Sequence, residues 1–257
     1  ERLVGSEMCI RDRFVATLQD LGIGARSQAR IISGIKSFFN FLRMEKCIDT
    51  NPSELIETPK LGMKLPDVLT VEEVDELVNS FDLSKPEERR NRAIVETLYS
   101  CGLRVSELVG LRMSNLYFND GYIIVEGKGK KQRLVPISEK AIKEIRPYID
   151  DRLSLDIKRG DENILFLNRR GTQLTRVMIF YIIKRACERC GVRKKVSPHT
   201  LRHTFATHLL EGGANLRAIQ QMLGHESITT TEIYTHLDRQ FLRQEILQHH
   251  PRNKKTL

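Results

Sequence analysis

The chain contains the stretch SPHTLRHTFAT at residues 197–207. The pair Ser197-Pro198 predicts the start of a helix, because serine caps free amide groups and proline fits the first helical turn. His199 and Arg202 are three residues apart, so both side chains are expected on one face of that helix. Gly212-Gly213 predicts its end. The stretch therefore presents a histidine next to an arginine at the beginning of a helix.

The segment after this helix ends in a tyrosine. A second helix is expected from about Asn215 to Leu223, ended by the glycine that follows. His225 comes directly after that glycine and is able to point at a neighbouring site. Thr229 and Glu232 have the spacing of a capping box, which places Tyr234 in the first turns of a short helix. A short helix can move as a unit, which suits a nucleophile that must be presented and withdrawn.

Upstream, residues 92–111 predict one helix that carries Arg104 and ends near Gly110. Two β-branched runs, residues 122–125 and 133–135, flank a segment rich in glycine and lysine and predict a β-hairpin with a basic tip. Residues 139–152 and 175–190 are expected to be helical, and residues 164–167 to form a short strand or a buried turn. The expected fold is mainly α-helical with a small β-hairpin or sheet.

These segments supply two arginines, two histidines, a lysine and a tyrosine: Arg104, Arg202, His199, His225, Lys128 and Tyr234. The set suits attack of a tyrosine on a phosphodiester whose charge is neutralised by protein cations. Each residue also has an ordinary interpretation, such as a core or surface tyrosine, a snorkelling arginine or an exposed hairpin lysine. The complete set, in this order and in loop and helix-start contexts, favours the chemical interpretation.

Bulk charge points to a polyanionic partner. The 257 residues carry a net charge of +9, with a pI of about 9.4. Such a balance favours nucleic acid or an anionic membrane surface. The sequence has no apolar run near the roughly 20 residues of a membrane span, so no membrane partner is expected. No signal-peptide pattern is recognised either, and a cytoplasmic location is expected. Residues 1–60 hold 9 Lys/Arg against 8 Asp/Glu, so most of the excess charge lies after them.

The five cysteines are expected to be reduced thiols. Cys187 and Cys190 form a single CxxC, and no second pair completes a zinc site. A metal-dependent nuclease would need clustered carboxylates or histidines, whereas the acidic pairs of this chain sit in polar stretches. No metal and no cofactor are expected.

Punctuation residues divide the chain into two parts. Residues 14–47 predict a helical region, with apolar side chains at helical spacing and Ser27 as a cap. Residues 58–66 have the proline and glycine content of a linker. A new helix is expected after Thr70, with Glu73 completing a capping box. The expected domains are residues 1–64 and residues 65–257.

Four motifs resemble those of the tyrosine recombinase (phage integrase) family, most closely its Xer-type members. The similar segments are YSCGLRVSEL at 99–108, GKGK at 127–130 with RLVP at 133–136, SPHTLRHTFAT at 197–207, and LGH at 223–225 with Tyr234. The match extends from about Ala25 to the C-terminus. The resemblance implies a truncated helical N-terminal DNA-clamp (SAM-like) region followed by a tyrosine recombinase catalytic domain.

The resemblance also implies a role for each residue. Tyr234 would attack phosphorus and leave a 3′-phosphotyrosyl link, which stores the bond energy and makes ATP unnecessary. Arg104 and Arg202 would bind the non-bridging oxygens, and His225 would hydrogen-bond the same phosphate. His199 would take the tyrosine proton, and Lys128 would protonate the leaving 5′-oxygen. The expected DNA-backbone contacts are Lys130, Lys131 and Arg133.

The implied partners are double-stranded DNA, a homo- or hetero-tetramer with a related recombinase, and a DNA-translocating activator. The implied function is site-specific recombination that resolves chromosome dimers. Alternatives are a phage or transposon integrase, a type IB topoisomerase-like enzyme and a catalytically inactive DNA-binding relic. Only about 64 residues precede the expected catalytic part, and Glu1 is no initiator, so a truncated clamp is the favoured explanation. The apolar stripe of the final helix is expected either to pack on its own domain or to dock on a neighbour, ahead of a disordered segment 251–257.

Overall fold

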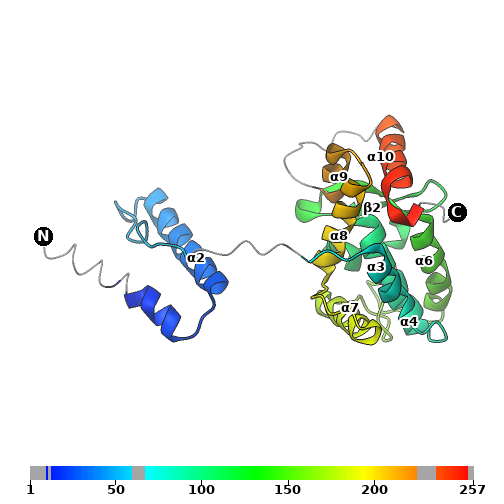
Figure 1. Cartoon of the computed structure of the whole chain (residues 1–257), viewed down its shortest axis with the longest axis horizontal. Coiled ribbons are helices and arrows are strands. Elements are labelled where there is room, and N and C mark those ends of the chain that lie inside the picture. Colours follow the sequence, from blue (N-terminus) through cyan, green and yellow to red (C-terminus); the bar gives the residue numbers. More distant parts are fainter. Residues whose placement is uncertain (1–9, 11–12, 60–66, 225–235, 254–257) are drawn as a thin grey trace, which may run out of the picture. The chain divides into compact units, whose positions relative to one another are not determined.

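The computed structural model describes residues 10, 13–59, 67–224 and 236–253. The chain divides into two compact units, Glu1–Leu65 and Pro66–Leu257 (Figure 1). Within the described residues, no helix combines the length and the apolar composition needed to cross a membrane.

The helical region predicted over residues 14–47 contains two helices of the first unit. Residues 13–20 are helical, and α2 (Ala25–Met44) follows a turn at Gly22, whose φ is +68°. Gly24 is the N-cap of α2, so Ser27 lies inside the helix and the predicted cap is wrong. Gln28 ties the turn to the helix, because its side-chain amide donates to Ile23 O over 2.7 Å.

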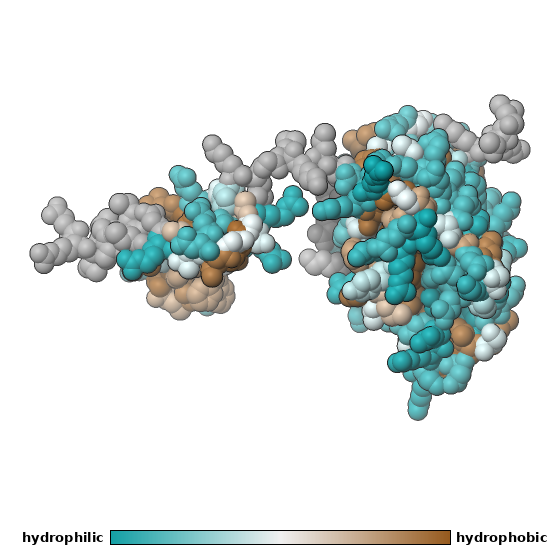
Figure 2. Space-filling model, turned by 60° about the horizontal axis from the view of Figure 1, so that its bottom comes forward, coloured by the Kyte–Doolittle hydropathy of each residue, from teal (hydrophilic) through white to brown (hydrophobic). Residues whose placement is uncertain are grey.

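The first unit buries little apolar surface. Ile32 of α2 is fully buried, but Phe38, Phe41 and Met44 on the same helix are between 54% and 77% exposed. Figure 2 shows this as hydrophobic surface on the smaller unit, whereas the visible face of the larger unit is mainly hydrophilic.

The second unit contains a helical body and one small sheet, as predicted for the fold class. The capping box of Thr70 and Glu73 forms and begins α3. The predicted start at Ser197-Pro198 is also confirmed, since the Ser197 hydroxyl accepts from the Thr200 amide. The α-helices described in the second unit are α3 (Val71–Asn79), α4 (Pro86–Cys101), α5 (Val105–Val109), α6 (Glu139–Arg152), α7 (Arg176–Cys190), α8 (Pro198–Glu211), α9 (Leu216–Leu223) and α10 (His236–His249). Its short 3-10 turns are η1 (Met113–Asn115), η2 (Lys128–Lys130) and η3 (Pro251–Asn253).

The single helix predicted over residues 92–111 is broken in two at Gly102. This residue has a φ of +58° and ends α4 in the left-handed conformation, which glycine adopts without a side-chain penalty. A Cβ at Gly102 would overlap the ring of Phe205. Three residues later the chain starts α5, so Arg104 lies at a helix junction instead of inside a helix.

The predicted hairpin is confirmed as part of a three-stranded antiparallel sheet. The order is β1-β2-β3, with Tyr122 opposite Pro136 and Glu126 opposite Gln132. Residues 164–167 form isolated bridges rather than a strand, and Leu165, Phe166 and Leu167 are fully buried. The strands are β1 (Leu116–Tyr117), β2 (Tyr122–Glu126) and β3 (Gln132–Pro136).

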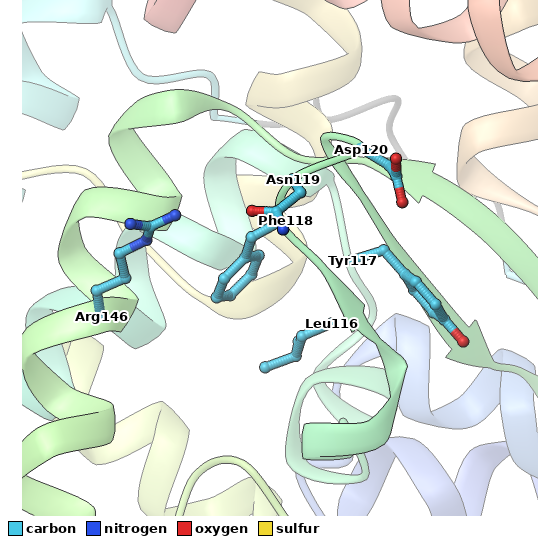
Figure 3. Close-up of a pocket in the computed structure, with 6 residues that line it drawn as sticks. All are labelled: Leu116, Tyr117, Phe118, Asn119, Asp120 and Arg146. Carbon is cyan, nitrogen blue, oxygen red and sulfur yellow. The ribbon is translucent and has the colours of Figure 1, made fainter.

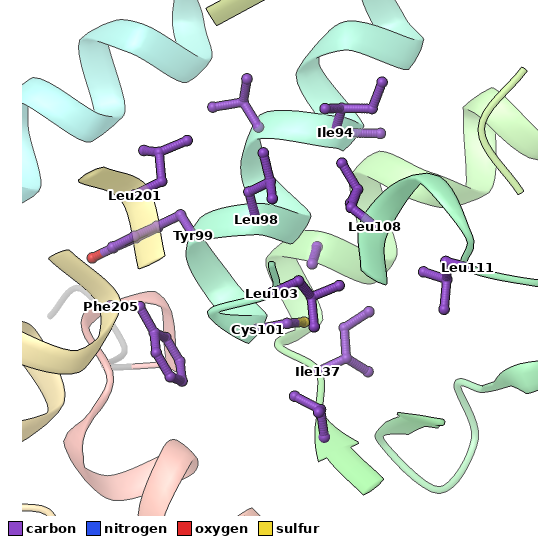
Figure 4. Packing of buried hydrophobic residues seen from close by; sticks show 14 of the residues in the cluster. Ile94, Leu98, Tyr99, Cys101, Leu103, Leu108, Leu111, Ile137, Leu201 and Phe205 are labelled. Carbon is purple, nitrogen blue, oxygen red and sulfur yellow. The ribbon is translucent and has the colours of Figure 1, made fainter. Parts of the chain in front are cut away.

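The core of the second unit forms around α4. Every residue of α4 from Ala93 to Cys101 is buried. Tyr99, Phe166 and Phe205 are the largest fully buried side chains among the described residues. Figure 4 shows Tyr99 and Leu98 of α4 facing Leu201 and Phe205 of α8. Because α4 and α8 share this packing, the loop after α4 and the first turns of α8 are held at fixed positions.

The C-terminal helix packs on its own unit. Leu242 and Ile246 of α10 are 1% exposed and belong to the core, so this half of the expected apolar stripe packs on its own unit, whereas Phe241 and Leu247 are 41% and 46% exposed. The prediction of disorder is wrong for residues 251–253, which form η3. Arg252 is buried there, donates to Glu96 over 2.9 Å, also bonds Asp75, and lies over the Tyr99 ring. We call Arg252, Glu96, Asp75, Tyr99 and His250 the Arg252 cluster.

Candidate active site

A second group of charged side chains lies where α5, β3, α8 and the end of α9 meet. Glu107 of α5 is its only acid among the described residues, and its side chain is 1% exposed. Around it are Arg104 from the junction before α5, Arg133 from β3 and Arg202 from α8. We call these four residues the Glu107 cluster.

The Glu107 carboxylate binds all three guanidinium groups. Arg133 makes a two-pronged contact, with Nη1 donating to Oε1 over 2.6 Å and Nη2 to Oε2 over 2.8 Å. Arg104 donates its Nη1 to Oε1 over 2.9 Å and its backbone amide to Oε2 over 2.8 Å. Arg202 Nη1 lies 3.8 Å from Oε2. The carboxylate therefore holds three cations from three different segments.

The same three arginines bind three consecutive carbonyl groups at the end of α9. Arg133 Nε donates to Met222 O over 2.8 Å, Arg202 Nη2 to Leu223 O over 2.6 Å, and Arg104 Nη2 to Gly224 O over 3.2 Å. The last carbonyls of a helix have no partners within the helix and carry partial negative charge. The arginines supply those partners and fix the point at which the chain leaves α9.

The Glu107 cluster has more positive than negative charge. Burial by itself raises the pKa of Glu107, but the hydrogen bond and charge of Arg133, joined by the backbone and side-chain hydrogen bonds of Arg104, hold that pKa below its usual range. Glu107 is therefore ionised at neutral pH, and three guanidinium groups face one carboxylate, a net charge of +2. Burial and repulsion by Arg104 lower the pKa of Arg202 to about 10. A bound anion would reduce the repulsion between these guanidinium groups and stabilise their charged forms.

Exposure distinguishes the three arginines. The side chain of Arg104 is 38% exposed, whereas those of Arg202 and Arg133 are 11% and 8% exposed. Arg133 is buried, and its three nitrogens all donate to Glu107 or to Met222 O. We therefore correct the expectation that Arg133 contacts the DNA backbone, because its guanidinium is engaged inside the protein. Arg202 is also held inside the protein, because its Nη1 donates to Gly102 O over 2.8 Å and its Nη2 to Leu223 O, which leaves Arg104 as the most exposed of the three.

The basic hairpin begins beside the cluster. A Cβ on Gly127, the residue before Lys128, would lie 3.7 Å from Glu107 Oε1 and 3.8 Å from Arg133 Nη1. Lys128 starts η2 at this point, and Lys130 and Lys131 are exposed. Lys130 has a φ of +60°, which marks the tight turn at the tip. The backbone thus carries the hairpin away from the arginines into solvent.

His199 lies in the first turn of α8, is exposed, and precedes Arg202 by one helical turn. The structure brings Arg104 and Arg202 together at Glu107. His199 lies on α8, the same helix as Arg202, and the turn that begins at Lys128 follows Gly127, which lies close to Glu107. His225 and Tyr234 lie outside the described residues. Gly224, the last described residue before them, is bonded to Arg104.

Sequence reasoning missed Glu107 as a functional residue. Its signal was an acid three residues after Arg104 in an otherwise apolar segment, a spacing that allows contact within one helical turn. The contact with Arg133 had no local signal, because 26 residues separate the two positions.

The described residues also contain an open cavity of about 350 Å³ between the β1–β2 turn and α6 (Figure 3). Its lining residues are Leu116, Tyr117, Phe118, Asn119, Asp120 and Arg146. Arg146 is the single guanidinium of that lining, so it lacks the surplus of positive charge found around Glu107. Among the described residues, no group of three or more His, Cys, Asp or Glu side chains is arranged to hold a metal ion.

Comparison with known proteins agrees with the motifs. Residues 67–240 match the phage integrase family. The chain is 44% identical over 243 residues to a protein named tyrosine recombinase XerD from Chlorobaculum tepidum, covering 93% of this chain and 80% of that protein.

Two solved structures are similar over most of the chain. The crystal structure of XerA recombinase has a TM-score of 0.58 and 34% identity, over 95% of this chain and 83% of that one. The Tn1549 transposon integrase in complex with circular intermediate DNA has a TM-score of 0.68 and 25% identity, over 84% and 76% of the two chains. The chain therefore belongs to the phage integrase family, as a Xer-type tyrosine recombinase.

Proposed function

We propose that this protein is a site-specific recombinase that cleaves and rejoins DNA through a 3′-phosphotyrosyl intermediate on Tyr234, and that it resolves chromosome dimers. The second unit is the catalytic domain, and the first contacts DNA as a helical clamp region. Family membership supports DNA strand transfer. The single observation that carries the proposal is the net positive Glu107 cluster, which holds Arg202 beside the more exposed Arg104.

The reaction needs an anion site that becomes stronger as charge builds up on phosphorus. A guanidinium group matches two phosphate oxygens at once, and its attraction grows with the extra charge of the transition state. Arg104 and Arg202 are held by Glu107 and by carbonyls at the end of α9, so little reorganisation is needed when DNA binds. Two fixed guanidinium charges support a mechanism without a metal ion.

In the cleavage step, the Tyr234 oxygen forms a bond to phosphorus and the bond to the 5′-oxygen breaks. His199 accepts the phenol proton, and Lys128 donates a proton to the leaving 5′-oxygen. His225 donates a hydrogen bond to the phosphate. The phosphotyrosyl link keeps the energy of the original diester, so attack by a 5′-hydroxyl reseals the strand without ATP.

The substrate is double-stranded DNA, on which related subunits assemble as a tetramer. The net charge of +9 supports binding to phosphates, and a structural relative was solved in complex with DNA. A DNA-translocating motor is proposed as the activator, and the cytoplasm as the location, because the chromosome is the substrate. Lys130 and Lys131 are proposed as backbone contacts from their exposed positions on the hairpin.

The test is incubation with a nicked suicide substrate in the presence of EDTA. A covalent protein–DNA adduct on a denaturing gel is the expected result, and Tyr234→Phe should abolish it. An adduct that requires Mg²⁺ would contradict the metal-free mechanism. Absence of an adduct from the wild-type protein would support an inactive DNA-binding protein.

Two further measurements separate the remaining roles. Relaxation of supercoiled plasmids without site preference would indicate a type IB topoisomerase-like enzyme instead. For Lys128→Ala we expect slow cleavage that a better leaving group at the 5′ position restores. If the better leaving group restores nothing, Lys128 is not the general acid.

A further inference from the structure

We propose that Arg133 is a positioning residue that holds Arg104, Arg202 and the end of α9 in one fixed arrangement for the recombination reaction. The inference rests on the proposed function of Arg104 and Arg202. It gives Arg133 a task other than contact with DNA, although the residue belongs to a basic hairpin.

The contacts of Arg133 connect three elements. From β3 its two terminal nitrogens hold both oxygens of Glu107 on α5, and its Nε holds Met222 O in the last turn of α9. An arginine fork can satisfy these three acceptors together because its donors are fixed in one plane. A lysine carries the same charge but lacks the planar fork.

Removal of Arg133 would alter the balance of charge at Glu107. Each oxygen of the Glu107 carboxylate accepts one hydrogen bond from Arg133 and one from Arg104, and Arg202 Nη1 lies 3.8 Å from Oε2 as an ion pair. Without Arg133, the freed lone pairs of this buried carboxylate would draw the remaining guanidinium groups inward. Arg104 and Arg202 would then lie farther from the position of the scissile phosphate.

The Arg133 side chain lies against the backbone of Gly224 at the end of α9. A Cβ on Gly224 would lie 3.1 Å from Arg133 Cδ and 3.2 Å from its Nε, closer than ordinary packing contacts. Gly224 also has a φ of +65°, a conformation that disfavours other residues. Glycine at this position therefore satisfies the turn and the close approach of the arginine together.

The test compares Arg133→Lys with two matched variants. Arg152→Lys removes another buried arginine, whose Nε and Nη2 donate to Ile164 O and Glu162 O far from the Glu107 cluster. Lys131→Met removes an exposed charge of the same hairpin. For each folded protein, well below its melting temperature, we would measure the single-turnover cleavage rate and the salt dependence of DNA affinity.

Arg133→Lys should cleave about 10- to 100-fold more slowly. This is the scale found in metalloenzymes when a group that orients a metal-binding side chain by hydrogen bonding is removed. Its DNA affinity and salt slope should equal those of the wild type, whereas Lys131→Met should lower the slope by about 0.9. Arg152→Lys should lower the melting temperature without slowing cleavage. Wild-type cleavage by Arg133→Lys, or a salt slope reduced as in Lys131→Met, would overturn the proposal.

Hydrogen exchange tests the arrangement without any activity. Amides of residues 216–224 should exchange about tenfold faster in Arg133→Lys, the effect of losing one hydrogen bond to a charged group, while those of α6 stay unchanged. Unchanged exchange at 216–224 would contradict the proposal. If wild-type protein forms no adduct but exchange responds as expected, the proposed reaction fails and the positioning role of Arg133 remains.

Discussion

The second unit contains two buried arginine–glutamate clusters with opposite charge balance. In the Glu107 cluster three arginines share one carboxylate, a net +2, and Arg104 is 38% exposed. In the Arg252 cluster one arginine binds two carboxylates, and its side chain is 1% exposed. Surplus positive charge near the surface makes an anion site, whereas a buried cation paired with two carboxylates makes a structural joint.

The largest effect is expected from Arg252→Met. Removal of the cation leaves Glu96 buried beside apolar side chains without its partner, at a cost of about 3–5 kcal/mol in the free energy of unfolding. Denaturant titration measures this loss. Adding Glu96→Met to the first substitution should recover much of the stability, and failure to recover would show that the pair is not the source of the cost.

Arg202→Met should show the reverse pattern. Loss of one preorganised donor to the phosphate should reduce the cleavage rate about 10²- to 10³-fold. The free energy of unfolding should fall less than in Arg252→Met, because loss of the Arg202 hydrogen bonds to Gly102 O and Leu223 O is partly offset by removal of a cation that burial and the charge of Arg104 disfavour. Single-turnover cleavage and denaturant titration of the same sample measure both quantities. A destabilisation as large as that of Arg252→Met would remove the distinction between the clusters.

The Arg252 cluster should also make stability depend on pH. Burial, with smaller contributions from the charges of Arg252 and His208, lowers the pKa of His250 to about 3. In the unfolded chain His250 takes up a proton near pH 6.5, whereas in the folded protein it stays neutral at that pH. The free energy of unfolding therefore falls as the pH drops below 6.5. The expected loss is about 1.4 kcal/mol between pH 8 and pH 5.5. His250→Phe should remove this contribution, and an unchanged pH profile in that variant would contradict it.

The smallest effect concerns the edge of the same cluster. Tyr99 OH lies 2.8 Å from His208 Nδ1, with both side chains buried. Tyr99→Phe should cost about 1 kcal/mol, the value of one buried hydrogen bond, without changing the cleavage rate. Thermal unfolding measures the cost. A slowed reaction would mean that the two clusters are coupled through α4.

Local signals in the sequence were enough for most of the second unit. Caps at Thr70 and Ser197 and the β-branched runs around the lysine-rich turn act within a few residues, and the structure has the elements they predict. The family motifs likewise identified Arg104 and Arg202, which the structure brings together at Glu107.

The errors have a common physical cause. At Gly102 α4 ends in a left-handed turn, and Phe205, about a hundred residues away, occupies the space that a side chain would need there. Arg133 resembles its exposed lysine neighbours until β3 is placed against α5 and α9. Arg252 follows a polar stretch and was expected to be disordered. In each case a partner distant in sequence decides the outcome, and local propensity does not contain it.

The bond between Arg252 and Glu96 spans 156 residues. At a synthesis rate of 5–20 residues per second, Glu96 leaves the ribosome roughly 8 to 30 s before its cation does. The interior of the unit must therefore stay incomplete during that interval, with a charged group waiting in water. Chaperones that shield nascent chains would find this unit at its most exposed just before Arg252 emerges.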